Sequence, residues 1–104
     1  MNKYYWAAIS NDERINAINE ITGIVNRFAT ISNFQKFSDI SLNLILELEE
    51  CYLNNLLNEL KEILSLDSIN ASFPDSKTPC IVLLNITFTK GTGYLEIEVP
   101  DISE

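Results

Sequence analysis

The strongest constraint on the fold of this chain is the order in which strand-like and helix-like spacings of apolar residues follow one another. A strand places successive side chains on opposite faces, whereas a helix returns to the same face every three to four residues. These two periods predict strand, helix, strand, strand, helix and strand, followed by a last hairpin, within 104 residues. That order predicts an α+β fold, and the length and an apolar content of 46% predict a single domain spanning residues 1–104, with one core.

Four predicted strands differ in how their apolar residues are distributed. Lys3 to Ile9 and Cys80 to Thr89 are apolar on both faces, which indicates interior strands. Ile40 to Leu48 alternates strictly, with leucine or isoleucine at every second position, which indicates a strand with one buried face. Thr30 to Phe37 alternates poorly, and we expect it to be an irregular edge strand.

Two segments have the spacing of amphipathic helices. The first is expected from Asp12 to Phe28, with Ser10 and Glu13 forming an S-x-x-E capping box at its start. The second is expected over 50–66, where leucine and isoleucine form an unbroken stripe. A coiled-coil seam is the alternative for this stripe, but it lasts for too few heptads.

The remaining segments are predicted as connections and a last strand. Asp67 to Pro79 is a loop that is long for a compact domain, and such loops are often functional. Thr89 to Gly93 superficially resembles a phosphate-binding loop, but its spacing favours a plain hairpin turn. Tyr94 to Val99 alternates as a returning strand.

This order of elements predicts a ferredoxin-like βαββαβ two-layer sandwich, with two helices on one face of an antiparallel sheet. With strands numbered along the chain, the expected spatial order is 4-1-3-2, and the C-terminal hairpin strand lies beside strand 4. The other face of the sheet would carry Tyr5 or Trp6 and Ile45. A partly apolar open face usually binds a partner or a ligand, so we expect a homodimer that uses these three residues as its interface.

The charge distribution argues against several classes of partner. The net charge is −8, and the seven basic residues are scattered along the chain. Binding to nucleic acid or to an anionic membrane surface is therefore not expected. No signal peptide and no membrane-length apolar run is apparent, so we expect a cytoplasmic protein in which Cys51 and Cys80 are free thiols.

The chain contains no histidine, which removes the commonest base and the commonest metal ligand. Serine or cysteine nucleophiles activated by histidine are thereby excluded. Glu47 with Glu49, and Glu96 with Glu98, could hold a divalent ion, but a solvated strand face explains each pair more simply. We expect no catalytic residues, no metal and no cofactor.

The connection after the first strand is a candidate ligand site. Asn11, Asp12 and Arg14 lie there beside a predicted helix N-terminus, whose free N–H groups can bind an anion. The simpler interpretation is that these residues only cap the helix.

One segment resembles a known family. Ile21 to Phe28 is similar to the first-helix segment of ACT regulatory domains in acetolactate synthase small subunits, and Ile31 to Phe34 is similar to their second strand. The resemblance implies a ferredoxin-like domain without chemistry of its own that dimerises. It also implies binding of amino acid-like molecules at the first loop and the dimer interface, with Asn11 and Asn33 as matching positions.

Three functions compete at this stage. The first is a non-enzymatic regulatory or ligand-binding module that acts as a homodimer. The second is an acidic interaction protein, similar to immunity or inhibitor proteins, that binds a basic protein partner. The third is a small ferredoxin-like enzyme. It is disfavoured because the arginine-bearing loop of acylphosphatases and the histidine of dimeric barrel oxygenases are both missing.

Overall fold

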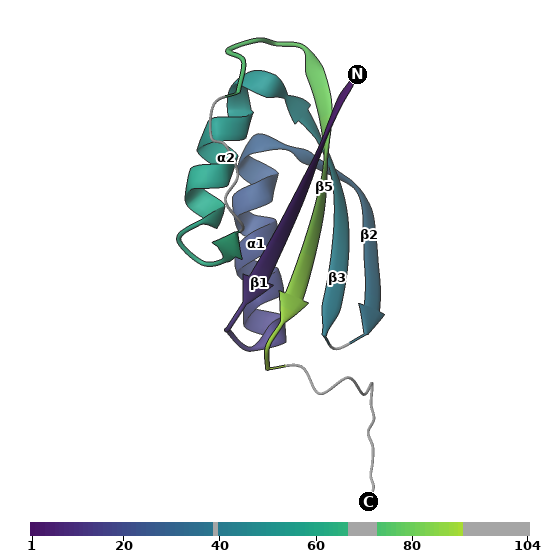
Figure 1. Ribbon diagram of the computed structural model, residues 1–104, viewed down its shortest axis with the longest axis vertical. Coiled ribbons are helices and arrows are strands. Elements are labelled where there is room, and N and C mark those ends of the chain that lie inside the picture. The colour runs from purple at the N-terminus through teal and green to yellow at the C-terminus, as the bar shows by residue number, and fades with distance from the viewer. Residues whose placement is uncertain (39, 67–72, 91–104) are drawn as a thin grey trace, which may run out of the picture.

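The computed structural model describes residues 1–38, 40–66 and 73–90 and shows a sheet with two helices packed on one of its faces (Figure 1). The class is α+β, and the sheet is mixed, with strand order β2-β3-β5-β1-β4. The elements are β1 (Asn2–Ser10), α1 (Arg14–Phe28), β2 (Thr30–Ser38), β3 (Ser41–Glu49), the 3₁₀ turn η1 (Glu50–Tyr52), α2 (Leu53–Leu60), β4 (Ser65–Leu66) and β5 (Pro79–Phe88).

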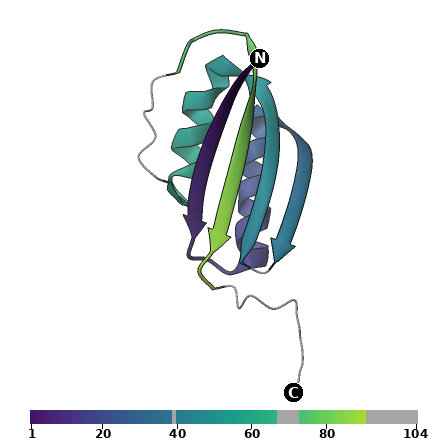
Figure 2. The same ribbon diagram turned by 45° about the vertical axis from the view of Figure 1, so that its right-hand side comes forward.

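The strand directions explain the mixed character of the sheet. β5 lies in the middle, parallel to β1 and antiparallel to β3. β2 pairs antiparallel with β3 at one edge, and the two-residue β4 pairs antiparallel with β1 at the other. Both helices cover the same face, which agrees with the expected two-layer arrangement (Figure 2).

The core lies between the helices and this face. β3 contributes every second residue, as its strict alternation predicts, and β5 contributes the same face along its whole length. The helices close the core with α1 residues such as Ile21 and Val25 and with four leucines of α2. The strand residues of the core are Trp6, Ala8, Leu42, Leu44, Leu46, Leu48, Cys80, Val82, Leu84, Ile86 and Phe88.

The expected ferredoxin-like strand order 4-1-3-2 differs from the observed order. The last described strand lies between β1 and β3 and runs parallel to β1, whereas the expectation put it outside β1 and antiparallel to it. The connection from α2 explains the difference. It first pairs Ser65 and Leu66 with the outer edge of β1, and the long segment 67–78 then precedes β5. A strand that is apolar on both faces gains most from this central position.

Helix boundaries differ from the expectation at two points. The capping box is wrong because Ser10 is a buried residue of β1, paired with Phe88, so the helix begins later. Glu13 is the N-cap instead, and its carboxylate accepts hydrogen bonds from the N–H groups of Ile15 and Asn16, each at 3.1 Å. The second helix ends at Leu60 rather than at residue 66, because the next residues turn toward the edge of β1.

The edge strand β2 confirms the expectation from its irregular pattern. Its pairing with β3 shifts register between Ile31 and Asn33 and again between Lys36 and Ser38. Such shifts are typical of edge strands. The strand expected over 94–99 and most of its hairpin turn lie outside the described residues.

Candidate functional site

The face of the sheet opposite the helices is covered by no described helix or strand, and we call it the open face (Figure 2). Paired residues of neighbouring strands point to the same side, so the register arranges the side chains of this face in rows. Tyr5 pairs with Leu83, and Leu83 pairs with Ile45. We call these three apolar residues the central row.

The central row is accessible from outside. Tyr5 is 71% exposed, and Leu83 and Ile45 are half-buried. A hollow of about 370 Å³ lies over the row, and Ala7 also lines it. An exposed tyrosine beside two aliphatic side chains is typical of a protein interface, because the ring is largely apolar and its hydroxyl remains able to bond.

The row next to the central row carries one charge of each sign. Lys3 pairs with Ile81, and Ile81 pairs with Glu47, so the two charges lie on opposite sides of β5. Both charged residues are exposed. Two strand spacings separate them, about 10 Å. Within the described part of the chain neither forms an ion pair.

The row on the other side of the central row is rich in amides. Asn85 Nδ2 donates a hydrogen bond of 2.6 Å to Asn43 Oδ1. Gln35 pairs with Asn43 from β2, and all three amides line the hollow. This row therefore offers both donors and acceptors to a polar ligand.

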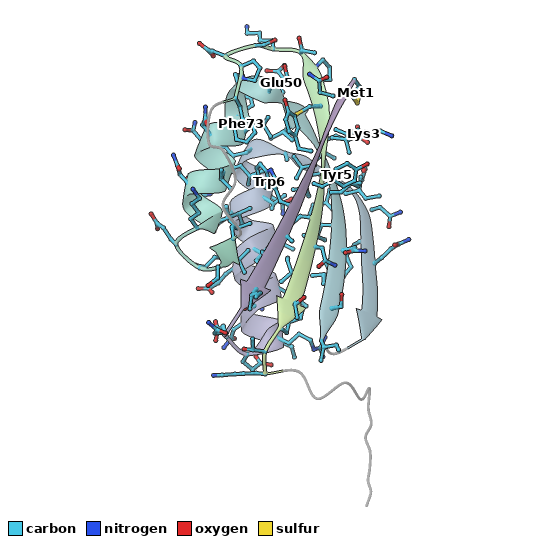
Figure 3. All side chains as sticks on the ribbon, viewed as in Figure 1. Met1, Lys3, Tyr5, Trp6, Glu50 and Phe73 are labelled. Atoms are coloured by element: carbon cyan, nitrogen blue, oxygen red, sulfur yellow. The ribbon has the colours of Figure 1, made fainter. Side chains whose placement is uncertain are left out.

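The structure separates the three residues predicted for the interface. Tyr5 and Ile45 lie on the open face, in one row. Trp6 points to the helices, is 3% exposed, and packs against the ring of Phe73 with centroids 6.0 Å apart (Figure 3). Leu83 was missed as an interface residue, although the two apolar faces of its strand were the signal that could have found it.

The first loop brings Asn11 and Asp12 together with the turn after α2. Both line a hollow of about 420 Å³ that also includes Lys61 to Ser65. The side chains of Asn11 and Asp12 are already engaged: Asn11 Oδ1 accepts from Thr89 Oγ1 at 2.9 Å, and Asp12 Oδ1 accepts from the Glu13 N–H at 2.7 Å. Together with the Glu13 cap, these bonds favour the capping interpretation of this loop.

The other two predicted ligand residues do not line this hollow. Arg14 is the first residue of α1 and does not line that hollow. Asn33 lies on β2 and pairs with Ile45, so it extends the central row at its far end. The sheet order places β5 and β3 between β1 and β2, so Asn33 is grouped with the predicted interface and not with the first loop.

A buried carboxylate lies on the helix side of the sheet, at the end where β1 begins. Glu50 is 3% exposed, and its Oε2 accepts from Asn2 Nδ2 at 2.7 Å and from Tyr4 Oη at 2.8 Å. These two hydrogen bonds lower the pKa of Glu50, and the bond from Asn2 has the larger effect. The hydrogen bond to Glu50 raises the pKa of Tyr4.

The group around Glu50 holds the described part of the segment before β5. The Glu50 N–H donates to the Thr78 carbonyl at 3.0 Å, and the Phe73 ring meets the Tyr4 ring edge-on at 5.4 Å. The sequence suggested no role for Glu50. Its contacts indicate a structural one, because they join β1, η1 and the segment 73–78.

Both cysteines are free thiols, as expected. Burial raises the pKa of Cys80 to about 11, with a smaller contribution from Glu50. Burial also raises the pKa of Cys51, whose neighbour Glu49 adds to the effect. Each thiol is therefore a weaker nucleophile at neutral pH than a free cysteine.

Residues 1–38, 40–66 and 73–90 contain neither a cluster of metal ligands nor a membrane-spanning helix. No cluster of three or more cysteine, aspartate or glutamate side chains in these ranges could hold a metal ion. None of the helices described there has the length and apolar character needed to cross a membrane.

Comparison with protein families, with curated proteins and with solved structures found no match to this chain.

Proposed function

We propose that this chain is a non-enzymatic binding module in which two copies associate through the open face. The observation that carries the proposal is the central row, an exposed tyrosine next to two half-buried aliphatic residues on a sheet face that no described element covers. Exposed apolar surface of this kind is stabilised by a partner.

The size of the open face favours a reversible dimer. Four strands of about nine residues, spaced about 4.8 Å apart with a rise of about 3.3 Å, give a face of about 570 Å². Two such faces would bury about 1,100 Å², which is near the lower limit for specific interfaces. We therefore expect a dissociation constant in the micromolar range.

The amide row supports a regulatory role for the dimer. Asn43, Asn85 and Gln35 line the hollow beside the central row, so a small polar molecule held between two copies would meet amide donors and acceptors. An amino acid-like ligand suits such groups. Its binding would stabilise the dimer and raise the melting temperature.

Sedimentation velocity on two matched variants tests the proposal. Tyr5→Glu places a charge in the central row, and Ile15→Glu makes the same change at a 57% exposed isoleucine of α1. We expect Tyr5→Glu to shift the protein to monomer, while Ile15→Glu keeps the wild-type distribution. Equal behaviour of the two variants would refute an interface at the open face.

A basic protein partner is the second candidate for the same face. Glu47 lies on β3 in the row next to the central row, and Glu49 lies one row further out. The net charge of −8 would also attract such a partner. Affinity capture should then recover a basic protein whose binding weakens as salt rises and is lost in Tyr5→Glu. Salt-independent recovery would argue against this candidate.

A further inference from the structure

We infer that the two copies are related by a twofold axis parallel to β5, so that Lys3 of each copy faces Glu47 of the other. The inference rests on the proposed dimer and specifies its geometry. It depends on the order of the strands, on the register of the rows and on two exposed charges of opposite sign.

The strand order makes β5 a natural axis. β5 is the middle strand, with β1 and β3 on its two sides and the edge strands β4 and β2 beyond them. A twofold axis along β5 places β5 over its own copy and β1 over β3 of the partner. Two sheets stacked in this way overlap over β1, β5 and β3, and β2 extends past the two-residue β4 of the partner.

The same axis keeps every row in place and exchanges its two ends. Tyr5 then lies over Ile45 of the second copy, and Leu83 lies over Leu83. In the next row, Lys3 lies over Glu47, and the symmetry creates this pair twice. In these two rows, apolar groups therefore meet apolar groups and the cation meets the anion.

The distances between stacked sheets allow these pairs to form. Stacked sheets lie about 10 Å apart, and the twist of each sheet rotates their mean strand directions by up to about 30°, so the axis runs within about 15° of β5. Lys3 and Glu47 lie one strand spacing across and two residues along from the centre of the face, about 8 Å from it, and such a crossing shifts facing residues there by about 4 Å. The long lysine side chain can span this shift, because its apolar stem is flexible and its ammonium group stays at the rim of the interface.

The other in-plane axis, perpendicular to the strands, gives a worse match. It exchanges the rows on the two sides of the central row, so Lys3 would face Ala7 and Glu47 would face Asn43. Four charges would then lie in the interface without a partner of opposite sign, which is unfavourable. The two unpaired charges therefore select the axis along β5.

Charge exchange tests this geometry. Lys3→Glu places a carboxylate against Glu47 of the second copy, and Glu47→Lys places an ammonium against Lys3. At low salt we expect each variant to dimerise about tenfold more weakly or worse, because two attractive pairs become repulsive. The double variant Lys3→Glu/Glu47→Lys restores both pairs, and we expect it to dimerise like the wild type.

A mixture of the two single variants gives the sharpest result. In a mixed dimer, the new glutamate at 3 faces the new lysine at 47, and the original Glu47 faces the original Lys3. We therefore expect an equimolar mixture to form a heterodimer with near wild-type affinity, although each variant alone is weak. Sedimentation equilibrium, with one variant carrying a dye, measures both constants.

Net charge alone predicts a different pattern. Glu47→Lys would then strengthen the dimer of this acidic chain and Lys3→Glu would weaken it. Lys61→Glu, an exposed change outside the open face, is the control for net charge. If the wild type dimerises but the dimer affinities of the variants follow net charge, or if the mixture dimerises no more tightly than each variant alone, the axis would be overturned while the proposed dimer stays intact. A monomeric wild type would overturn both.

Discussion

Replacing Trp6 by alanine should destabilise the domain strongly, whereas the same change at the adjacent Tyr5 should not. The two residues follow one another on β1 but lie on opposite faces: Trp6 is 3% exposed beneath the helices, and Tyr5 is 71% exposed on the open face. The pair therefore separates the core from the candidate interface within one strand.

The expected magnitudes follow from burial. Truncation of a buried tryptophan to alanine costs about 3–5 kcal/mol, because the lost contacts leave a cavity. In Trp6→Ala the ring of Phe73 also loses its neighbour. At about 4–8 °C per kcal/mol for a domain of this size, the melting temperature should fall by at least about 12 °C. Tyr5→Ala should cost about 1 kcal/mol or less, from strand propensity alone.

Thermal unfolding followed by far-ultraviolet circular dichroism measures both effects, since Trp6 is the single tryptophan and fluorescence fails in its variant. The fall in melting temperature caused by Trp6→Ala should be the same at every protein concentration. The fall caused by Tyr5→Ala should grow with concentration, because this variant loses the stabilisation that dimerisation provides. If Trp6→Phe and Trp6→Ala were both as stable as the wild type, the assignment of the two faces would be refuted.

Three further predictions follow from individual groups. Hydrogen bonds from Asn2 and Tyr4 hold the pKa of Glu50 below its ordinary value of 4.5, so its contribution to stability should be complete above pH 4.5 and decline below it. Urea titrations should show this loss of unfolding free energy in the wild type. If the unfolding free energy of Glu50→Gln fell as steeply with decreasing pH, the prediction would be contradicted. Cys80, whose pKa is raised from 9.0 to about 11, should resist a thiol reagent at pH 8 until the protein unfolds. Its contribution to the stability of the fold should decrease as pH rises above 9.0. If the folded protein were labelled as fast as the protein in denaturant, Cys80 would not be buried. Gly23→Ala should stabilise the domain by about 0.5–1 kcal/mol, because an added Cβ at this helix position meets nothing within 4 Å; a lower denaturation midpoint would disprove this.

Local structure was predictable where one period dominates the pattern. The alternation of Ile40 to Leu48 predicted β3 and its buried leucines, and the poor alternation of Thr30 to Phe37 predicted an irregular edge strand. Each of these two strand patterns depends only on residues that are close in the sequence and on which face of the strand is buried. The end of α1 at Phe28 was also predicted.

Features that depend on distant contacts were not predictable in the same way. The second helix ends early because Ser65 and Leu66 pair with β1, some 57 residues away. The capping box failed because the pairing of Ser10 with Phe88 makes Ser10 the last residue of β1. Strand order failed for a related reason, since no local pattern indicates whether β5 lies inside or outside β1.

The candidate interface was predicted in part. An apolar open face with Tyr5 and Ile45 on it follows from alternation once both helices cover the other side. The choice between Tyr5 and Trp6 could not be made, because β1 is apolar on both faces and only the position of the helices distinguishes them. The charged row could not be foreseen, because it joins Lys3 and Glu47 through a strand that was expected elsewhere in the sheet.

The solution mass of the untagged protein tests the central claim most directly. Light scattering at about 100 µM, well above a micromolar dissociation constant, should give twice the chain mass of 11.8 kDa. The dimer should persist at high salt, weakened but present, because its centre is apolar and its charges lie at the rim. A mass of 11.8 kDa at both salt concentrations would contradict the account and leave the open face free for a different partner.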